Sequence, residues 1–188
     1  MKKAPRPVWD ARLTAAQNAK AVLPGLAGHF FAAGRRLAAR AVSPKKLHQF
    51  RLETKRVRYS LELFRPCYGP RLESRLKALK TIQDFLGELN DCISARQLVD
   101  GSAAATPREK KGLERYLKSR AAAQEAGFQK YWHEVFDAPG QQKKWVEYLK
   151  NYAGRNEAPA STRGRRTARE VTAASTRDTP GAQVSEPR

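Results

Sequence analysis

Acidic residues are scarce in this sequence. Its 188 residues include 18 Asp and Glu against 37 Lys and Arg, which gives a formal net charge of +19 and a pI near 10.4. A field of this size attracts polyanions over a Debye length of about 8–10 Å. The candidate partners are therefore nucleic acid, an anionic membrane and an inorganic polyanion.

Cysteine and histidine are also rare, and their positions do not match metal or disulfide patterns. The two cysteines, Cys67 and Cys92, lie in helical sequence without CxxC spacing, and the three histidines have no cluster of carboxylates beside them. We expect both cysteines to be reduced and partly buried. We expect no metal ion and no cofactor.

Long apolar runs are absent. No window reaches the roughly 18 apolar residues of a membrane span, and the N-terminal segment MKKAPRPVWDAR has no apolar stretch after its basic residues. We therefore expect a soluble, cytoplasmic protein that does not bind membranes. A hydrophobic fraction of 40% is sufficient for one modest core.

Helical periodicity extends over most of the chain, and no strand pattern is found. We predict an all-α protein with an antiparallel helical bundle over residues 8–153. Residues 154–188 contain only two large aliphatic side chains, Val171 and Val184, and are rich in Arg, Thr, Ser, Ala and Pro. Because such a segment cannot bury enough apolar surface to fold, we predict a disordered basic tail.

Prolines and capping residues mark the ends of the expected helices. Ser43 and Thr106 each precede a proline at a first helical position, whereas Pro24 predicts a break because it removes a hydrogen bond from a helix interior. The expected helices cover residues 8–42 in two parts, 43–65, 69–100, 106–135 and 141–152. Apolar stripes predict the core positions Leu72, Leu79, Ile82, Leu86, Leu89, Ile93, Leu113, Leu117, Phe128, Trp132 and Val135.

Motifs for catalysis or nucleotide binding are not found. The segment GHFFAAGRR at residues 28–36 lacks the Lys-Ser/Thr pair and the preceding strand of a phosphate-binding loop. His133 and Glu134 lack the second histidine of a zinc-binding helix. No nucleophile, base and orienting group can be identified together. We therefore expect a protein that is not an enzyme.

The segment KKLHQFRLETKRVRYSLELF at residues 45–64 contains six Lys or Arg and one His but only two acids. On a helical wheel, one arc of about 80° contains four of the cationic positions, and the apolar residues occupy a separate arc. Lys45 and Lys46 add positive charge to the first turn, where the helix dipole is already positive. The four cationic positions on the arc are His48, Arg51, Lys55 and Arg58.

Members of this arc are about 5–6 Å apart along the helix, close to the spacing of alternate phosphates in an extended phosphate chain. A linear polyanion could therefore lie along the helix. The alternative is that these side chains form an ordinary solvated surface, and for His48 a purely structural role is equally open.

Two motifs together resemble a known family. LHQFRLETKRVRYSLELF and, further along, LKTIQDFLGELNDC at residues 79–92 resemble the CHAD domain, the conserved-histidine α-helical domain. The resemblance covers about residues 10–150. It implies an antiparallel helical bundle that binds inorganic polyphosphate through basic residues. The positions implied to bind are His48, Arg51, Lys55, Arg58 and Lys80.

The second motif also suggests supporting residues. Asp84, Glu88 and Asp91 lie on one polar stripe that could pair with the cations of the 45–64 helix, and we interpret Asp91 as an orienting residue. Gly87 is predicted to allow a close approach between helices, because it has no side chain to obstruct one.

CHAD domains usually contain two related bundles, whereas this sequence has one clear signature. A symmetric homodimer could supply a second copy of the basic surface. A second set of cations with the same spacing faces away from the apolar positions of its own helix, as an ordinary solvated surface would. This set is Arg108, Lys111, Arg115 and Lys118.

The function that the sequence favours is non-enzymatic binding of inorganic polyphosphate through a basic helical face. A general nucleic-acid-binding protein is the alternative, because the same cations suit any phosphate backbone. This alternative is weaker because the sequence has no recognition-helix motif and no surface set of aromatic residues for base stacking. A phosphohydrolase is a third alternative, and it would need carboxylates that hold a divalent ion near the basic face.

Overall fold

Helices account for all the regular secondary structure in residues 8–39, 43–103 and 106–154, which are the residues that the computed structural model describes. The predicted all-α fold is confirmed. All described residues belong to one unit of the chain, and residues 155–188 of the predicted tail lie outside them. The elements are α1 Ala15–Ala38, α2 Pro44–Leu63, α3 Arg65–Tyr68, η1 Pro70–Leu72, α4 Glu73–Gly101, α5 Pro107–Tyr131, the π-helical η2 Trp132–Phe136, and α6 Gln141–Asn151.

Capping boxes fix the starts of α1 and α5. The Thr106 hydroxyl accepts from the backbone N–H of Glu109, and the Glu109 carboxylate accepts from the backbone N–H of Thr106 at 2.8 Å. Thr14 and Gln17 form the same arrangement at α1. Each box satisfies N–H groups that a helix start otherwise leaves without partners.

The predicted break at Pro24 is wrong, because α1 continues through this residue. Proline in a helix interior costs about 3 kcal/mol through the lost hydrogen bond and a steric clash. Buried side chains on both sides of Pro24, among them Leu23, Leu26 and Phe30, hold one continuous face against the core. Their burial offsets the cost, at roughly 1.5–3 kcal/mol for each large apolar side chain.

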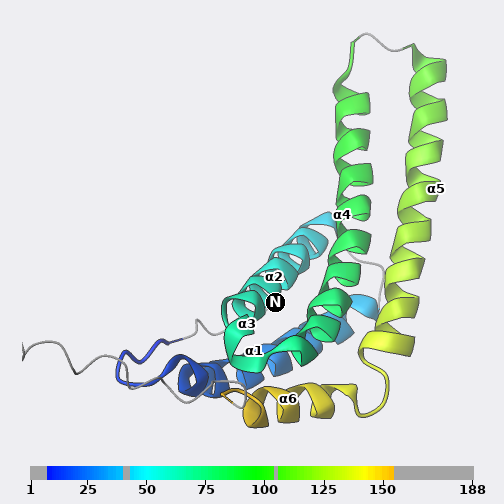
Figure 1. The fold of residues 1–188 in the computed structure, drawn as a ribbon. Helices are drawn as coiled ribbons and strands as arrows, with labels where there is room; N and C mark the ends of the chain where they lie inside the picture. The colour runs from blue at the N-terminus through cyan, green and yellow to red at the C-terminus, as the bar shows by residue number, and fades with distance from the viewer. Residues whose placement is uncertain (1–7, 40–42, 104–105, 155–188) are drawn as a thin grey trace, which may run out of the picture. The chain divides into compact units, whose positions relative to one another are not determined.

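The helices pack in a sequence of neighbouring pairs (Figure 1). α1 packs against α2 and α6, α2 packs against α4, and α4 packs against α5. α4 and α5 lie side by side and run in opposite directions. α3 and η1 separate α2 from α4 in the sequence, yet these two helices pack against each other.

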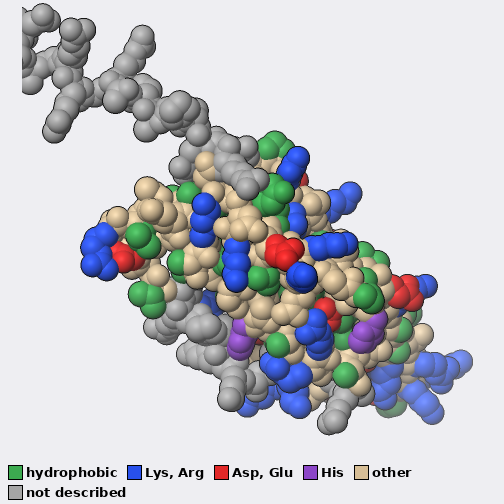
Figure 2. Space-filling view, turned by 90° about the horizontal axis from the view of Figure 1, so that it is seen from below, with side chains coloured by type: hydrophobic (Ala, Val, Ile, Leu, Met, Phe, Trp, Pro, Cys, Tyr) green, Lys and Arg blue, Asp and Glu red, His purple; other side chains and the backbone are tan. Residues whose placement is uncertain are grey.

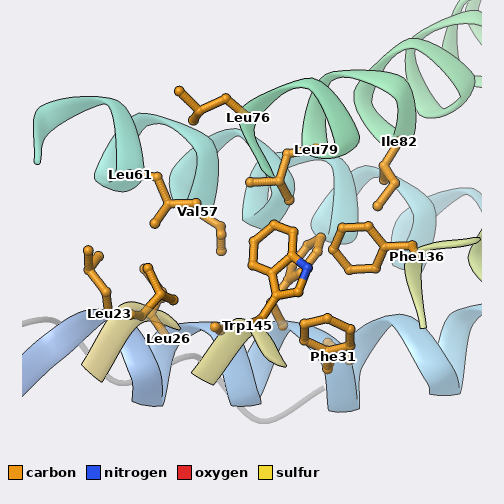
Figure 3. Packing of buried hydrophobic residues seen from close by; sticks show 14 of the residues in the cluster. Leu23, Leu26, Phe31, Val57, Leu61, Leu76, Leu79, Ile82, Phe136 and Trp145 are labelled. Atoms are coloured by element: carbon orange, nitrogen blue, oxygen red, sulfur yellow. The ribbon is translucent and has the colours of Figure 1, made fainter. Parts of the chain in front are cut away.

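The core gathers buried side chains from α1, α2, α4, η2 and α6 (Figure 3). Trp132 is fully buried, and its ring lies 5.8 Å from Phe30, 5.8 Å from Phe50 and 4.9 Å from Phe136. Aromatic pairs at these separations add about 0.5–1.5 kcal/mol each beyond the burial of their area. Trp132 is thus the centre of the aromatic core.

Most of the predicted core positions are confirmed, with two exceptions. Leu113 is 46% exposed and Val135 is 52% exposed. Leu113 lies near the start of α5, where α4 is the principal neighbouring helix. Val135 lies in η2, whose π-helical winding moves side chains off the positions of an α-helical wheel. Cys67 and Cys92 are both buried and form no disulfide, as predicted.

No helix in the described part of the chain is both long and apolar enough to span a bilayer.

A partly buried titratable pair connects α1 and α2. His29 Nε2 lies 3.4 Å from Glu53 Oε1, and the Glu53 side chain is 12% exposed. Burial raises the pKa of the Glu53 carboxyl, because the charged form loses its hydration, and the positive charges of His29, Arg36 and Arg56 offset part of this effect. The protonated form of Glu53 is therefore favoured by folding.

Glu53→Gln is expected to raise the free energy of unfolding at neutral pH. A raised folded-state pKa means that the stability contributed by protonation is complete below the unfolded value, near 4.5, and is lost as the pH rises through the folded value. The glutamine amide does not ionise. The gain in the free energy of unfolding should therefore grow with pH and vanish below about pH 4. Urea unfolding at several pH values measures this difference, with the exposed Glu134→Gln as control for net charge. A less stable Glu53→Gln variant at pH 7 would contradict the assignment.

Candidate functional site

A shallow pocket lies along the border between α2 and α4. Its volume is about 270 Å³. Three of its lining residues come from α2 and three from α4. They are Arg51, Lys55, Arg58, Lys80, Gln83 and Asp84. Four predicted binding residues are thus brought together in one place.

The packing of the two helices accounts for this convergence. Phe50 and Val57 bury the inner face of α2, and Leu79 and Leu86 bury the facing side of α4. Side chains on the flanks of these faces must emerge where the two helices meet. Arg51, Lys55 and Arg58 are accordingly half-buried at this border.

The charges in the pocket are unbalanced. Arg51 and Lys55 form no ion pair with another residue that the structure describes, and the Nε of Arg51 is buried without a hydrogen-bond partner. Arg58 Nη1 donates to Glu62 at 2.6 Å, and Lys80 Nζ lies 2.8 Å from Asp84. Four cations and one carboxylate line the pocket, so an anion would complete it.

Lys80 can still bind an anion although it pairs with Asp84. Both side chains are more than half exposed, at 65% for Lys80 and 62% for Asp84. An exposed pair four residues apart on a helix contributes only about 0.3–0.5 kcal/mol. A multivalent anion in the pocket would therefore compete with Asp84 for the Lys80 ammonium.

Three further predicted binding residues lie outside the pocket. Lys45, Lys46 and His48 are exposed in the first turns of α2 and do not line it. They lie toward the N-terminal end of the same helix, ahead of Arg51. The N-terminus of α2 carries the positive end of the helix dipole and no acidic residue in its first turn. This end extends the positive potential along α2.

The family model for the CHAD domain matches residues 2–100 of the chain. This protein belongs to the CHAD family. The matched segment includes every residue that lines the pocket, and it ends one residue before the end of α4. α5, η2 and α6 lie beyond it. No curated protein and no solved structure matches the chain significantly.

The carboxylates of the second CHAD motif do not pair with α2 as predicted. Glu88 accepts from Arg120 of α5 at 2.5 Å, and Asp84 pairs with Lys80 of its own helix. The Asp91 carboxylate is exposed and has no hydrogen bond or ion pair with any described residue. These positions are spread around α4, so only Asp84 reaches the α2 border. The orienting role of Asp91 therefore gains no support from these contacts and stays a prediction.

The predicted close approach at Gly87 is also wrong. A Cβ placed on Gly87 would meet no atom within 4 Å. The close approaches occur at Gly34, whose Cβ would overlap the ring of Trp132, and at Gly127, whose Cβ would lie 2.8 Å from the ring of Phe85. The sequence pattern of α4 alone could not identify these two glycines, because a close contact depends on the distance between helices.

The second set of cations in the sequence stays on the surface of α5. All four are exposed, and Lys118 pairs with Glu114 at 2.6 Å. None of them lines the pocket between α2 and α4. Lys and Arg side chains are also scattered over the face of the molecule in Figure 2, with fewer Asp and Glu among them. The pocket differs from this general surface because its cations come from two helices and meet in one place.

One lining residue was missed as a candidate. Gln83 belongs to the second CHAD motif, and its side chain lines the pocket beside Lys80. An uncharged amide gives no electrostatic signal in a sequence, although its NH₂ group can donate to a phosphate oxygen.

Proposed function

We propose that this CHAD-family protein binds inorganic polyphosphate, without catalysing a reaction, in the pocket between α2 and α4. The observation that carries the proposal is the convergence of four cations from two helices on one shallow pocket with a single carboxylate. Two of these cations, Arg51 and Lys55, have no ion-pair partner in the described parts of the chain. The buried Nε of Arg51 lacks an acceptor, and an anion in the pocket would supply one.

The arrangement suits a chain better than a compact anion. Arg51, Lys55 and Arg58 follow one another along α2 at intervals of about 5–6 Å. The exposed Lys45, Lys46 and His48 continue the positive surface toward the start of the helix. A thin, flexible chain with a charge on every phosphate can contact these residues in succession. We propose that it extends from the pocket along α2.

Nucleic acid fits the pocket less well. Recognition of unpaired bases uses aromatic rings as stacking platforms, and no aromatic side chain from the described ranges lines this pocket. Tyr59 is exposed on α2, but the guanidinium of Arg58 lies 4.9 Å from its ring centroid. Adjacent phosphates of polyphosphate share a bridging oxygen, whereas a sugar separates those of a nucleic acid. The pocket can therefore contact more charges of polyphosphate per length.

Hydrolysis of a phosphate chain would need further groups. A divalent ion at the pocket would require several oxygen ligands from the protein. Asp84 is the one carboxylate among the described residues that line the pocket, and a single carboxylate offers too few of these ligands. Binding without hydrolysis is the function that this set of residues supports best, and we propose that it takes place in the cytoplasm.

The dependence of affinity on salt tests the proposal. Each cation that binds a phosphate releases a counterion, so the logarithm of the association constant should fall linearly with the logarithm of the salt concentration. Titration of the full chain with long-chain polyphosphate is expected to give a slope that corresponds to about four or more cations, since four line the pocket. A slope that corresponds to one or two cations would contradict the proposal.

A further inference from the structure

A second and larger pocket lies between the start of α4 and α6, and none of its residues lines the pocket between α2 and α4. Its volume is about 490 Å³. Three cations, one carboxylate and two tyrosines contribute most of its lining. These residues are Arg71, Arg75, Lys144, Glu147, Tyr148 and Tyr152.

Arg75 is an unusual residue for its position. It lies on the same stripe of α4 as the fully buried Leu79 and Ile82, where the pattern of the helix calls for an apolar side chain. Burial lowers the pKa of its guanidinium, because the charged form loses hydration. An arginine in such a position is rarely tolerated without a partner for its charge.

The protein itself satisfies only some of the hydrogen-bond donors of the Arg75 guanidinium. The guanidinium of Arg75 stacks 3.5 Å from the centroid of the Tyr148 ring, and its Nη1 donates to the carbonyl oxygen of Arg71 at 3.3 Å. Its Nε is buried with no acceptor. No carboxylate in the described residues forms an ion pair with Arg75. A buried donor without an acceptor costs about 1–3 kcal/mol, so an anion that supplies one would be stabilised.

The remaining charges of the pocket favour a dianion. Arg71 and Lys144 are exposed at the mouth, and Glu147 is the only acidic residue among the described residues of the lining. Three cations less one carboxylate leave a net charge of +2. The Tyr148 ring is buried and is contacted by the guanidinium of Arg75 and by the ring of Tyr152, so it offers no open face to a base or another planar group. The pocket therefore suits a phosphate group rather than an aromatic one.

We propose that this pocket binds the terminal phosphate group of a small phosphorylated ligand. Arg75 donates to the phosphate from the inside, while Arg71 and Lys144 hold it from the mouth of the pocket. This site is separate from the polyphosphate pocket proposed above, and it does not require that function. The terminal phosphate could belong to free phosphate, to a short phosphate chain or to a nucleotide, and the probes below distinguish these sources.

Site-resolved NMR of the full chain tests the proposal. Inorganic phosphate, tripolyphosphate and ATP are titrated separately at constant ionic strength, and the signals of Arg75 Nε–H and the Lys144 amide are followed beside those of Lys55 and Arg58. We expect saturable shifts at Arg75 and Lys144 with at least one probe, and the probe with the highest affinity identifies the source. Absence of saturable shifts at these two residues with all three probes would overturn the proposal.

Matched double variants separate binding in the pocket from general charge. Arg75→Gln could unfold the protein, so the test variant is Arg71→Gln with Lys144→Gln, which changes two exposed residues. It is expected to weaken binding at Arg75 at least about tenfold, as the loss of two charged hydrogen bonds predicts. The control, Lys130→Gln with Lys150→Gln, removes two exposed charges outside both pockets. Equal affinities at Arg75 in the two double variants would overturn the proposal.

Discussion

Replacement of Lys55 and Arg58 by alanine is expected to weaken polyphosphate binding at least about tenfold while the bundle stays folded. Both side chains line the pocket between α2 and α4, and both extend from the flank of the helix rather than from its buried face. Two phosphate contacts would be lost. The salt slope should therefore also decrease by about two cation equivalents.

The stability of this variant should change little. Among the described residues, the one ion pair lost is Arg58–Glu62, four residues apart on one helix, which contributes about 0.3–0.5 kcal/mol. Relief of repulsion among the cations of α2 opposes that loss. The free energy of unfolding should remain within about 1 kcal/mol of the original value, as measured by urea unfolding.

A matched control lies on α5. Arg115→Ala with Lys118→Ala removes one arginine, one lysine and one ion pair of the same kind, Lys118–Glu114, from an exposed surface. This variant is expected to retain affinity within about twofold at physiological salt, because distant surface charges are largely screened. Equal losses of affinity in the two double variants would mean that the protein binds polyanions over its whole surface rather than in the pocket.

Replacement of Gly34 by alanine is expected to produce the largest loss of stability. A Cβ at this position would overlap the ring of Trp132, which is fully buried and packs against Phe30 and Phe50. The ring cannot move without displacing its neighbours, because the core is closely packed. Overpacking of this kind costs about 1–3 kcal/mol, and more where the backbone must shift.

Two other helical glycines provide controls for this prediction. A Cβ on Gly25 or Gly87 would meet nothing within 4 Å, and neither residue has a positive φ. Alanine at either position should stabilise the protein by about 0.5–1 kcal/mol, because glycine loses more backbone entropy in a helix. Thermal or urea unfolding of the three variants measures the contrast. A Gly34→Ala variant as stable as Gly25→Ala would contradict the close packing of α1 against η2.

Features that depend on local sequence were predicted well. The capping box at Thr106, the proline at the start of α2 and the apolar stripe of α4 involve residues within a few positions of one another. The cationic flank of α2 belongs to the same class, because helical geometry alone places Arg51, Lys55 and Arg58 on one side. The resemblance to the CHAD family added Lys80, which belongs to a different helix and which the structure brings to the same pocket.

Features that depend on the distances between helices were not predicted. The continuity of α1 through Pro24 follows from burial on both sides of the proline. The pairing of Glu88 with Arg120 depends on which side of α4 contacts α5. Arg75 does give a signal in the sequence, because a single arginine interrupts an apolar stripe. That signal becomes a candidate site only when α6 places Lys144 beside it.

Competition between polyphosphate and nucleic acid tests the proposed binding function most directly. Long-chain polyphosphate is immobilised, and the full chain bound to it is displaced by free polyphosphate, double-stranded DNA or single-stranded DNA at equal phosphate concentration and near-physiological salt. We predict that free polyphosphate displaces the protein at a concentration at least about tenfold lower than either DNA, because its phosphates are closer together and carry no bases. Displacement by DNA at the same phosphate concentration would contradict the account and would leave only a general cationic surface.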